Sequence, residues 1–397
     1  MKMKKKTNLV IDLKSQPISN RFLKKKTKKN KLYKLKLIQD LKSGLIKLEK
    51  PFPAKELKPL FDWITYSEPE EHLKIMLSHI IKSKKILDNN KSKYKLNIAG
   101  ISFKDDSLLE LFGKKGHKTW RLDLIKDLNL SIGCGVETIQ SKLCSLNSKK
   151  IIKKYGKSDV IIVRHIWEHV YNQNKFINKL NQLLNLNGCI VFEIPDSSKL
   201  VRNYDYTMPW EEHLYYYSPR TFFESLNKNG LSIIFSNKIN YSYEDVIYAI
   251  VKPSKIIKNK NLIPVSTLKK ELSDAKKYSM YFEIKKKMVK DFFKKERKKG
   301  PIALFGAGHM SVSFISFFNI SSYIDYVLDG NKNKIGLYMP IGNKKIYNPD
   351  ILKMKNIKTC LLGMNPLHHS LVKNKYRHFK KSGGKFLSIY KNNFKYD

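Results

Sequence analysis

The 397-residue sequence has little cysteine, no long apolar run and few acidic residues for its many basic ones. Its four cysteines, Cys134, Cys144, Cys189 and Cys360, are widely scattered. They form no CxxC pair, so the sequence predicts reduced thiols and excludes both a disulfide framework and a cysteine zinc site. The longest apolar stretches, such as "IIVRHIW" and "CIVFEIP", are far shorter than the roughly 20 residues that span a bilayer. We therefore expect a soluble protein.

The N-terminus "MKMKKKTNLVIDLK" is basic but has no apolar core and no small-residue cleavage site of a secretory signal. This pattern predicts a cytoplasmic location. The 78 basic and 34 acidic residues give a net charge of +44, which raises the question of a nucleic-acid partner. The lysines are spread along the whole chain and accompany abundant Asn and Ile, and no stripe of arginine and aromatic residues interrupts them. The sequence therefore does not favour nucleic acid, and it predicts no membrane partner.

Composition shifts divide the chain into four parts. Residues 1–75 carry short alternating segments and read as a small β-rich module, and "EPEEHLKIMLSHIIKSKKIL" after them reads as a helix with acidic residues in its first turn. Residues 76–252 form a domain of alternating strands and helices. Residues 253–299 form a lysine-rich helical connector, and residues 300–397 form a Rossmann-like C-terminal domain.

Within 76–252, the β-like runs are "KLNIAGISF", "HKTWRLDL", "VETIQSKL", "DVIIVRHI" and "CIVFEIP", and helical segments separate them. This alternation predicts an α/β fold with a parallel sheet, which binds ligands at the carboxyl ends of its strands. Asp105, Asp123, His165 and Glu193 all fall at such ends. The alternative for each aspartate is a purely structural role as a helix cap or turn residue. His165 and His169 have a spacing that a metal could use, but no cysteine or third histidine lies near them in the sequence, so we predict no metal.

The segment "GPIALFGAGHMSVSFISFF" reads as strand, glycine turn and helix, and Asp329 ends the next strand. Gly306 and Gly308 would let a phosphate or carboxylate approach the start of the helix. One hypothesis for this part is therefore a nucleotide- or NAD-binding oxidoreductase with Asp329 on a ribose.

The stretch "WEEHLYYYSP" sets two glutamates beside His213, ahead of three tyrosines. A carboxylate beside a histidine fixes the ring tautomer and raises its basicity, so this group is a candidate proton-transfer site. The alternative is an ordinary surface hydrogen bond, with the tyrosines packed in the core.

The stretches "SDVIIVRHIWEHV", "FINKLNQLLNLNGCIVFEIPD" and "EEHLYYYSPRTFFESLNKNGLSII" together resemble the class I S-adenosylmethionine-dependent methyltransferases. More narrowly, the chain is similar to the C-methyltransferases of nucleotide-linked deoxysugars. Those chains join a zinc-binding module, a methyltransferase domain and a Rossmann-like C-terminal domain. "IDLKSQPISNRFL" and "FGAGHMSVSFISFFNISSYIDYVLDGNKNKIGLYMPIGNKKI" resemble the first and last parts, although the zinc-binding cysteines are absent here.

The resemblance implies a class I methyltransferase-like central sheet, S-adenosyl-L-methionine as cofactor and a nucleotide-linked keto-deoxysugar as substrate. His213 would be the base, with Glu212 orienting its ring and Tyr215 beside the substrate. Cofactor-binding residues would be Gly100, Asp105, Asp123 and His165, and substrate-binding residues would be Glu193, Gly306, Gly308 and Asp329.

The chain departs from the family's pattern at two places. Asp106 stands where the family's cofactor loop has a glycine, and Trp210 replaces a tyrosine near the reacting carbon. A noncatalytic protein with a methyltransferase fold is therefore the further alternative.

Overall fold

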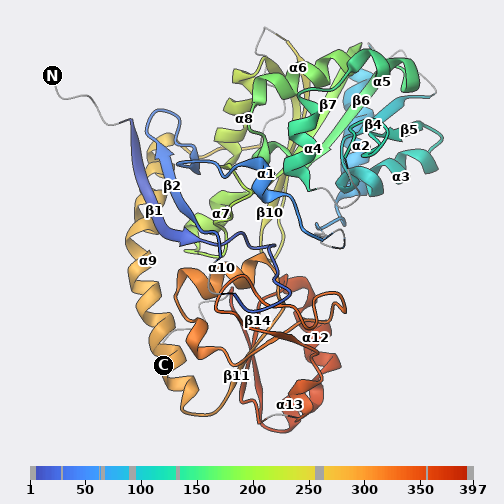
Figure 1. Cartoon of the computed structure of the whole chain (residues 1–397). Coiled ribbons are helices and arrows are strands. Elements are labelled where there is room, and N and C mark those ends of the chain that lie inside the picture. The colour runs from blue at the N-terminus through green and yellow to red at the C-terminus, as the bar shows by residue number, and fades with distance from the viewer. Residues whose placement is uncertain are drawn as a thin grey trace, which may run out of the picture.

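The computed structural model describes residues 6–27, 30–61, 63, 68–88, 95–130, 135–254, 263–354 and 356–390. Within these residues the chain forms three sheets, which belong to an N-terminal module, a central domain and a C-terminal domain (Figure 1). No helix of the described part has the length and apolar character needed to cross a membrane.

The N-terminal module is a four-stranded antiparallel sheet in the order β1-β2-β3-β8. The strands are β1 (Thr7–Gln16), β2 (Tyr33–Asp40), β3 (Ile46–Leu48) and β8 (Tyr215–Tyr216). In β2, Leu35 and Leu37 are buried while Lys34 and Lys36, which alternate with them, are more exposed, which is the alternation of a sheet with one buried face. The fourth strand comes from the centre of the chain, so this module is completed by residues far beyond its predicted end at residue 75.

The central domain is a six-stranded sheet in the order β5-β4-β6-β7-β10-β9. Its strands are β4 (Asn97–Gly100), β5 (Lys118–Arg121), β6 (Ser158–Arg164), β7 (Leu184–Asp196), β9 (Leu231–Ile239) and β10 (Asp245–Pro253). The first four in spatial order are parallel, and every residue of β6 is buried, as expected of a parallel sheet covered on both faces. The last two strands run antiparallel, so the sheet is mixed.

Helices surround this sheet. They are α2 (Leu73–Leu87), α3 (Asp106–Lys114), α4 (Val136–Leu143), α5 (Ser148–Tyr155), α6 (Gln173–Leu183), α7 (Ser197–Arg202) and α8 (Pro219–Lys228). Of these, α2, α3, α5 and α6 lie in segments that the sequence predicts as helical, α7 and α8 were not predicted, and two predictions need correction. The strand predicted at "VETIQSKL" is wrong, because this segment is α4 and it buries Ile139 and Leu143 with helical spacing. Helix α2 begins later than predicted, and the acidic residues precede its first turn.

The C-terminal domain is a five-stranded parallel sheet in the order β13-β12-β11-β14-β15, which confirms a second Rossmann-like unit. Its strands are β11 (Ile302–Phe305), β12 (Tyr326–Leu328), β13 (Ile346–Tyr347), β14 (Thr359–Leu362) and β15 (Lys385–Ser388). Its helices include α10 (His309–Phe317), α11 (Ile351–Met354), α12 (His369–Lys375) and α13 (Arg377–Lys381).

A 30-residue helix, α9 (Leu268–Arg297), fills most of the predicted connector. It runs along one side of the molecule from the central to the C-terminal domain (Figure 1) and contacts β1 and α7 on the way. Its buried residues recur every three to four positions, among them Ala275, Tyr278 and Phe282. The apolar residues of this stripe belong to one core cluster with residues of the N-terminal module, of α7 and of the C-terminal domain.

Candidate functional site

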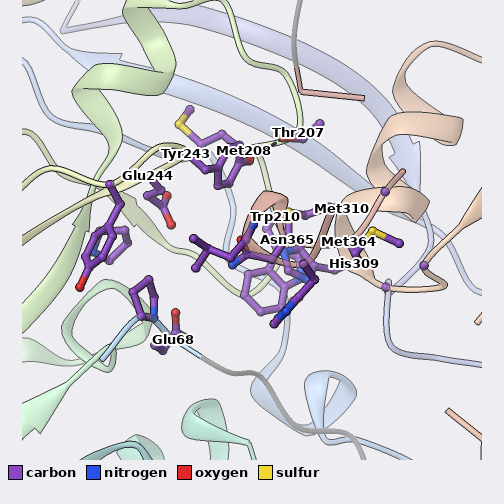
Figure 2. Close-up of a pocket in the computed structure, with 18 of the residues that line it drawn as sticks. Glu68, Thr207, Met208, Trp210, Tyr243, Glu244, His309, Met310, Met364 and Asn365 are labelled. Atoms are coloured by element: carbon purple, nitrogen blue, oxygen red, sulfur yellow. Dashed lines mark hydrogen bonds between the residues drawn. The ribbon is translucent and has the colours of Figure 1, made fainter. Parts of the chain in front are cut away.

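A cavity of about 320 Å³ lies between the central and C-terminal domains. Its volume is in the range of small-molecule sites. The central domain contributes Glu168, His213, Glu244 and other side chains to the lining, and the C-terminal domain contributes the glycine turn before α10. Figure 2 shows Glu68 and Glu244 on one side of this space and Trp210 with His309 on the other.

The loop Trp210–His213 brings the predicted base to the cavity. The Trp210 ring stacks on His309, the first residue of α10, with 4.2 Å between centroids, so the two domains touch here. His213 lines the cavity beside this stack. Burial, followed by the nearby His169 and His309 rings, holds the pKa of His213 well below its usual value. The imidazole is therefore neutral at physiological pH, which is the form that can accept a proton.

Glu212 does not lie where the sequence analysis expects it. Its carboxylate accepts a hydrogen bond from Asn20 Nδ2 at 2.7 Å, and no ion pair joins it to His213 in the described part of the chain. Consecutive residues of this turn point in different directions, which is why adjacency in sequence did not become contact. Tyr215 lies in β8, opposite Lys47 of β3, and is not part of the cavity lining.

The structure does bring a third histidine to His169. The candidate ligand atoms of Glu168, His169 and His213 lie within 4.8 Å of one another. His213 reaches His169 from a separate loop, so spacing along the sequence did not reveal this neighbour. His165 is not a member of this group.

Glu193 lies beneath the cavity, fully buried, and is the centre of a charge cluster rather than part of the lining. Arg164 Nε donates to it at 3.0 Å, His72 Nε2 lies 2.9 Å away, and His165 Nε2 lies 2.8 Å away. Burial alone would raise the pKa of Glu193, but Arg164, His165 and His72 hold it well below the usual value. The Glu193 carboxylate is thus already paired with side chains of the protein.

His165 lines the cavity with an unusual backbone, since its φ is +49°. Burial alone would lower its pKa, but Glu68, Glu168 and Glu193 raise it to about 10. The ring is therefore a fixed cation at neutral pH. Left-handed backbone in a non-glycine residue is uncommon, and here the His165 N–H donates to the Glu193 carbonyl at 2.8 Å.

A nucleoside cofactor would be expected at the loop after β4. Backbone N–H groups of this loop are hydrogen-bonded to the Asp105 side chain. The buried carboxylate accepts hydrogen bonds from the backbone N–H groups of Ile101, Ser102 and Arg164, at 2.7, 2.9 and 3.0 Å. Burial raises the pKa of Asp105 to about 7 in spite of these donors. Gly100 packs closely inside the loop, because a Cβ there would lie 2.7 Å from Leu109 Cδ1 and 3.0 Å from Asp105 Cβ. Both residues shape the loop from inside.

Asp123 follows β5 at the same edge of the sheet. Its Oδ1 accepts from the backbone N–H groups of Ile125 and Lys126, at 2.9 and 2.8 Å. This is the turn role that the sequence analysis gave as the alternative. The second oxygen, Oδ2, makes no hydrogen bond to the described residues and remains available to a ligand hydroxyl.

The glycine turn of the C-terminal domain also faces the cavity. Gly306 has a φ of +100°, and a Cβ there would lie 2.9 Å from the Met364 nitrogen, so glycine is required. Gly308 has open space around its Cα. The Asp329 carboxylate accepts from Ala307 N at 2.8 Å and from Lys334 Nζ at 3.1 Å. It thus supports the turn, and this occupation disfavours a ribose contact.

The cavity residues that the sequence analysis missed include Glu244 and His309. Glu244 stands between strands β9 and β10 without any motif around it, and burial, followed by the Glu68 charge, raises its pKa to about 8. His309 follows the glycine turn directly, and its place at the start of a helix after Gly308 was the one signal that could have identified it. Burial lowers the pKa of His309 to about 4.

Two family models of known proteins match successive parts of the chain. A family model described as a methyltransferase domain matches residues 101–235, and one described as a C-methyltransferase C-terminal domain matches residues 268–389. A curated relative, the C-methyltransferase NovU of Streptomyces niveus, is 24% identical over 127 residues. That match spans 32% of this chain and 30% of NovU, so the chain covers about a third of its relative's length.

Solved methyltransferase structures share limited similarity with the chain. The 1,6-didemethyltoxoflavin-N1-methyltransferase of Burkholderia thailandensis is 10% identical with a TM-score of 0.27, covering 52% of this chain and 95% of its own. The magnesium protoporphyrin IX methyltransferase of Synechocystis PCC 6803 is 15% identical with a TM-score of 0.29, covering 47% and 90%. Scores this low carry no argument, so the assignment depends on the two family models and on the topology of the sheets. Residues 101–235 thus match a methyltransferase domain, and residues 268–389 match a C-methyltransferase C-terminal domain.

Proposed function

We propose that this protein is an S-adenosylmethionine-dependent C-methyltransferase that acts on a nucleotide-linked keto-deoxysugar. The observation that carries the proposal is the position of His213. A neutral imidazole lines a cavity whose other wall belongs to the C-methyltransferase C-terminal domain. The similarity to NovU, which is a C-methyltransferase, supports carbon as the methylated atom.

The residues after β4 and β5 fit the cofactor in part. Asp123 Oδ2 would accept a hydrogen bond from a ribose hydroxyl, at the edge where such folds bind nucleosides. The N–H groups of Ile101 and Ser102 are not available, because Asp105 holds them. When bound, S-adenosylmethionine supplies a methyl group activated by its sulfonium.

His213 would remove a proton from the sugar carbon next to the ketone. The C–H electron pair would become that of the enolate and the proton would stay on the imidazole, while S-adenosylmethionine would supply the methyl group for the new bond at this carbon, leaving as S-adenosylhomocysteine when its sulfur–methyl bond breaks. The low pKa of His213 keeps its ring unprotonated before the reaction. Positioning of the reacting groups and exclusion of water would supply much of the remaining acceleration, since alignment alone can be worth about 7 to 11 kcal/mol of barrier.

The C-terminal wall would hold the nucleotide part of the substrate. Gly308 leaves its backbone exposed at the start of α10, and a helix N-terminus attracts phosphate. Lys334 lines the same wall and brings a positive charge to it, although it also neutralises Asp329. These groups match the charge of a nucleoside diphosphate.

Proton exchange at the substrate tests the assignment of the base. Wild-type protein should exchange the acidic proton of a thymidine diphosphate-linked 4-keto-6-deoxy sugar with deuterated water, as followed by NMR without methyl transfer. His213→Ala should slow this exchange by about 100- to 10,000-fold, the usual contribution of a general base. His117→Ala, which removes a half-buried imidazole outside the cavity, should have no effect. Undiminished exchange in His213→Ala would assign the base to another residue.

The oxidoreductase alternative is disfavoured by the engagement of Asp329 with its own turn. It predicts thermal stabilisation by NAD, whereas the methyltransferase proposal predicts stabilisation by S-adenosylhomocysteine. A thermal shift with NAD alone would favour the alternative.

A further inference from the structure

The turn Ser19–Asn20 of the N-terminal module reaches the base-bearing loop across 192 residues of sequence. Ser19 donates to Glu211 through its backbone N–H and through Oγ, the latter at 3.1 Å. Asn20 Nδ2 donates to Glu212 at 2.7 Å. All four residues are at most 5% exposed. Two buried carboxylates are thus compensated by donors from a turn distant in sequence, as their desolvation requires.

The rest of the loop is anchored as well. The Tyr216 hydroxyl accepts from the Trp210 N–H at 2.8 Å and donates to the Trp210 carbonyl at 3.0 Å. The His169 ring contacts the Glu212 carbonyl at 2.9 Å through Nδ1, which must donate because a carbonyl can only accept. The backbone N–H of His213 closes the turn on Trp210. Residues 210–212 are held in place, and His213 follows them into the cavity lining.

We propose that Ser19 and Asn20 are positioning residues for His213. They bind the two glutamates and thereby fix the direction in which the next residue projects. This inference rests on the proposed function in so far as His213 is the base. In this proposal Glu211 and Glu212 anchor the loop and do not contact the imidazole directly. Such control is chemically important, because a misplacement of about 1 Å can cost roughly 100-fold in rate.

The same N-terminal segment also contacts the C-terminal domain. Leu23 and Tyr338 exchange two backbone hydrogen bonds, at 3.0 and 2.8 Å, and Asn30 Nδ2 donates to the Pro340 carbonyl at 2.7 Å. The segment therefore contacts both the base-bearing loop and the C-terminal domain. Its position links the base-bearing loop to the domain that would bind the nucleotide.

The chain supplies a matched control for this proposal. Asn20→Ala and Asn30→Ala each remove one amide that donates at 2.7 Å within the same segment, but Asn30 contacts Pro340 and not the base-bearing loop. With the thymidine diphosphate 4-keto-6-deoxy sugar, we expect Asn20→Ala to slow proton exchange by about 10- to 100-fold. Asn30→Ala should exchange at the wild-type rate, and both should bind S-adenosylhomocysteine as the wild type does.

Ser19 allows a test by rescue. Ser19→Ala keeps the backbone donor and loses the hydroxyl, so it should give a smaller defect than Asn20→Ala. Ser19→Thr keeps the hydroxyl and should restore exchange. Equal defects in Ala and Thr variants would contradict a role for the hydrogen bond to Glu211.

A readout that does not depend on activity separates this inference from the proposed function. The measurement is NMR of protein with ¹³C-labelled histidine. The ring signal that disappears in His213→Gln is assigned to His213. This signal should shift or broaden in Asn20→Ala and stay in place in Asn30→Ala. If the wild type shows no proton exchange, His213 is not the base for this sugar, and the ring signal alone decides the positioning. An unmoved signal in Asn20→Ala, or equal exchange defects in Asn20→Ala and Asn30→Ala, would overturn the proposal.

Discussion

Asp105 offers the sharpest test of how the loop after β4 is built. The change is Asp105→Asn, which keeps the shape of the side chain and replaces one acceptor oxygen by an NH₂ group. In the structure, Oδ2 accepts from Ile101 and Ser102, and Oδ1 accepts from Arg164. Whichever way the amide lies, at least one buried N–H loses its acceptor and faces another donor.

The expected destabilisation follows from these bonds. A hydrogen bond to a charged group contributes about 1.5 to 3 kcal/mol, and a buried donor left without a partner costs about 1 to 3 kcal/mol. The lost hydrogen bond and the unpaired donor describe the same change, so their costs are not simply added. We expect Asp105→Asn to lower the free energy of unfolding by about 2 to 4 kcal/mol. The measurement is best made at pH 8, above the pKa of about 7, where the carboxylate is ionised.

The neighbouring residue is the control. Asp106 forms an ion pair with Arg121 at 2.7 Å, but its side chain is 53% exposed. An exposed pair contributes about 0 to 1 kcal/mol, so Asp106→Asn should change little. Urea unfolding followed by circular dichroism compares the two variants. If Asp105→Asn is as mild as Asp106→Asn, the loop does not depend on this carboxylate and our reasoning fails.

Two further predictions concern Asp123 and Glu244. Asp123→Ala should weaken S-adenosylhomocysteine binding by about 1.5 to 3 kcal/mol, the value of a hydrogen bond to a charged group, as measured by calorimetry; an unchanged affinity would remove Asp123 from the cofactor site. Glu244 has a folded-state pKa of about 8 against 4.5 as its reference value, so the folded state retains its proton longer than the unfolded state. Stability should therefore fall as pH rises from about 4.5 to 8, and this part of the fall should be absent in Glu244→Gln when melting temperatures are compared across pH. If the melting temperature depends on pH in the same way in the wild type and in Glu244→Gln, burial does not raise the pKa of Glu244.

The sequence predicted the elements of the fold better than their directions. Strand β6 was predicted from its apolar run, and its complete burial is what a parallel sheet requires. Strands β9 and β10 were not predicted, and their antiparallel direction would not follow from their apolar runs, because pairing direction leaves no trace in the apolar pattern of one strand. The segment "VETIQSKL" was misassigned because a short apolar run does not separate a helix from a strand.

The candidate site was predicted at the level of segments, not of contacts. The sequence identified His213 and the glycine turn as candidates, and both line the cavity. It could not predict that Asn20 holds Glu212, because nothing in either local pattern refers to a partner 192 residues away. Nor could it separate Asp105 as a loop support from Asp105 as a ligand, since both roles place a carboxylate at the end of a strand.

The pairing of β3 with β8 has a consequence for how the chain folds during synthesis. Strand β3 ends at Leu48, and its partner begins at Tyr215. At the usual pace of translation, on the order of 10 seconds or more separates the appearance of these two strands from the ribosome. Through that interval β3 is an open edge, ready to pair with another nascent chain. Lys47, in the middle of this short strand, provides a charge that discourages such pairing until Tyr215 and Tyr216 arrive.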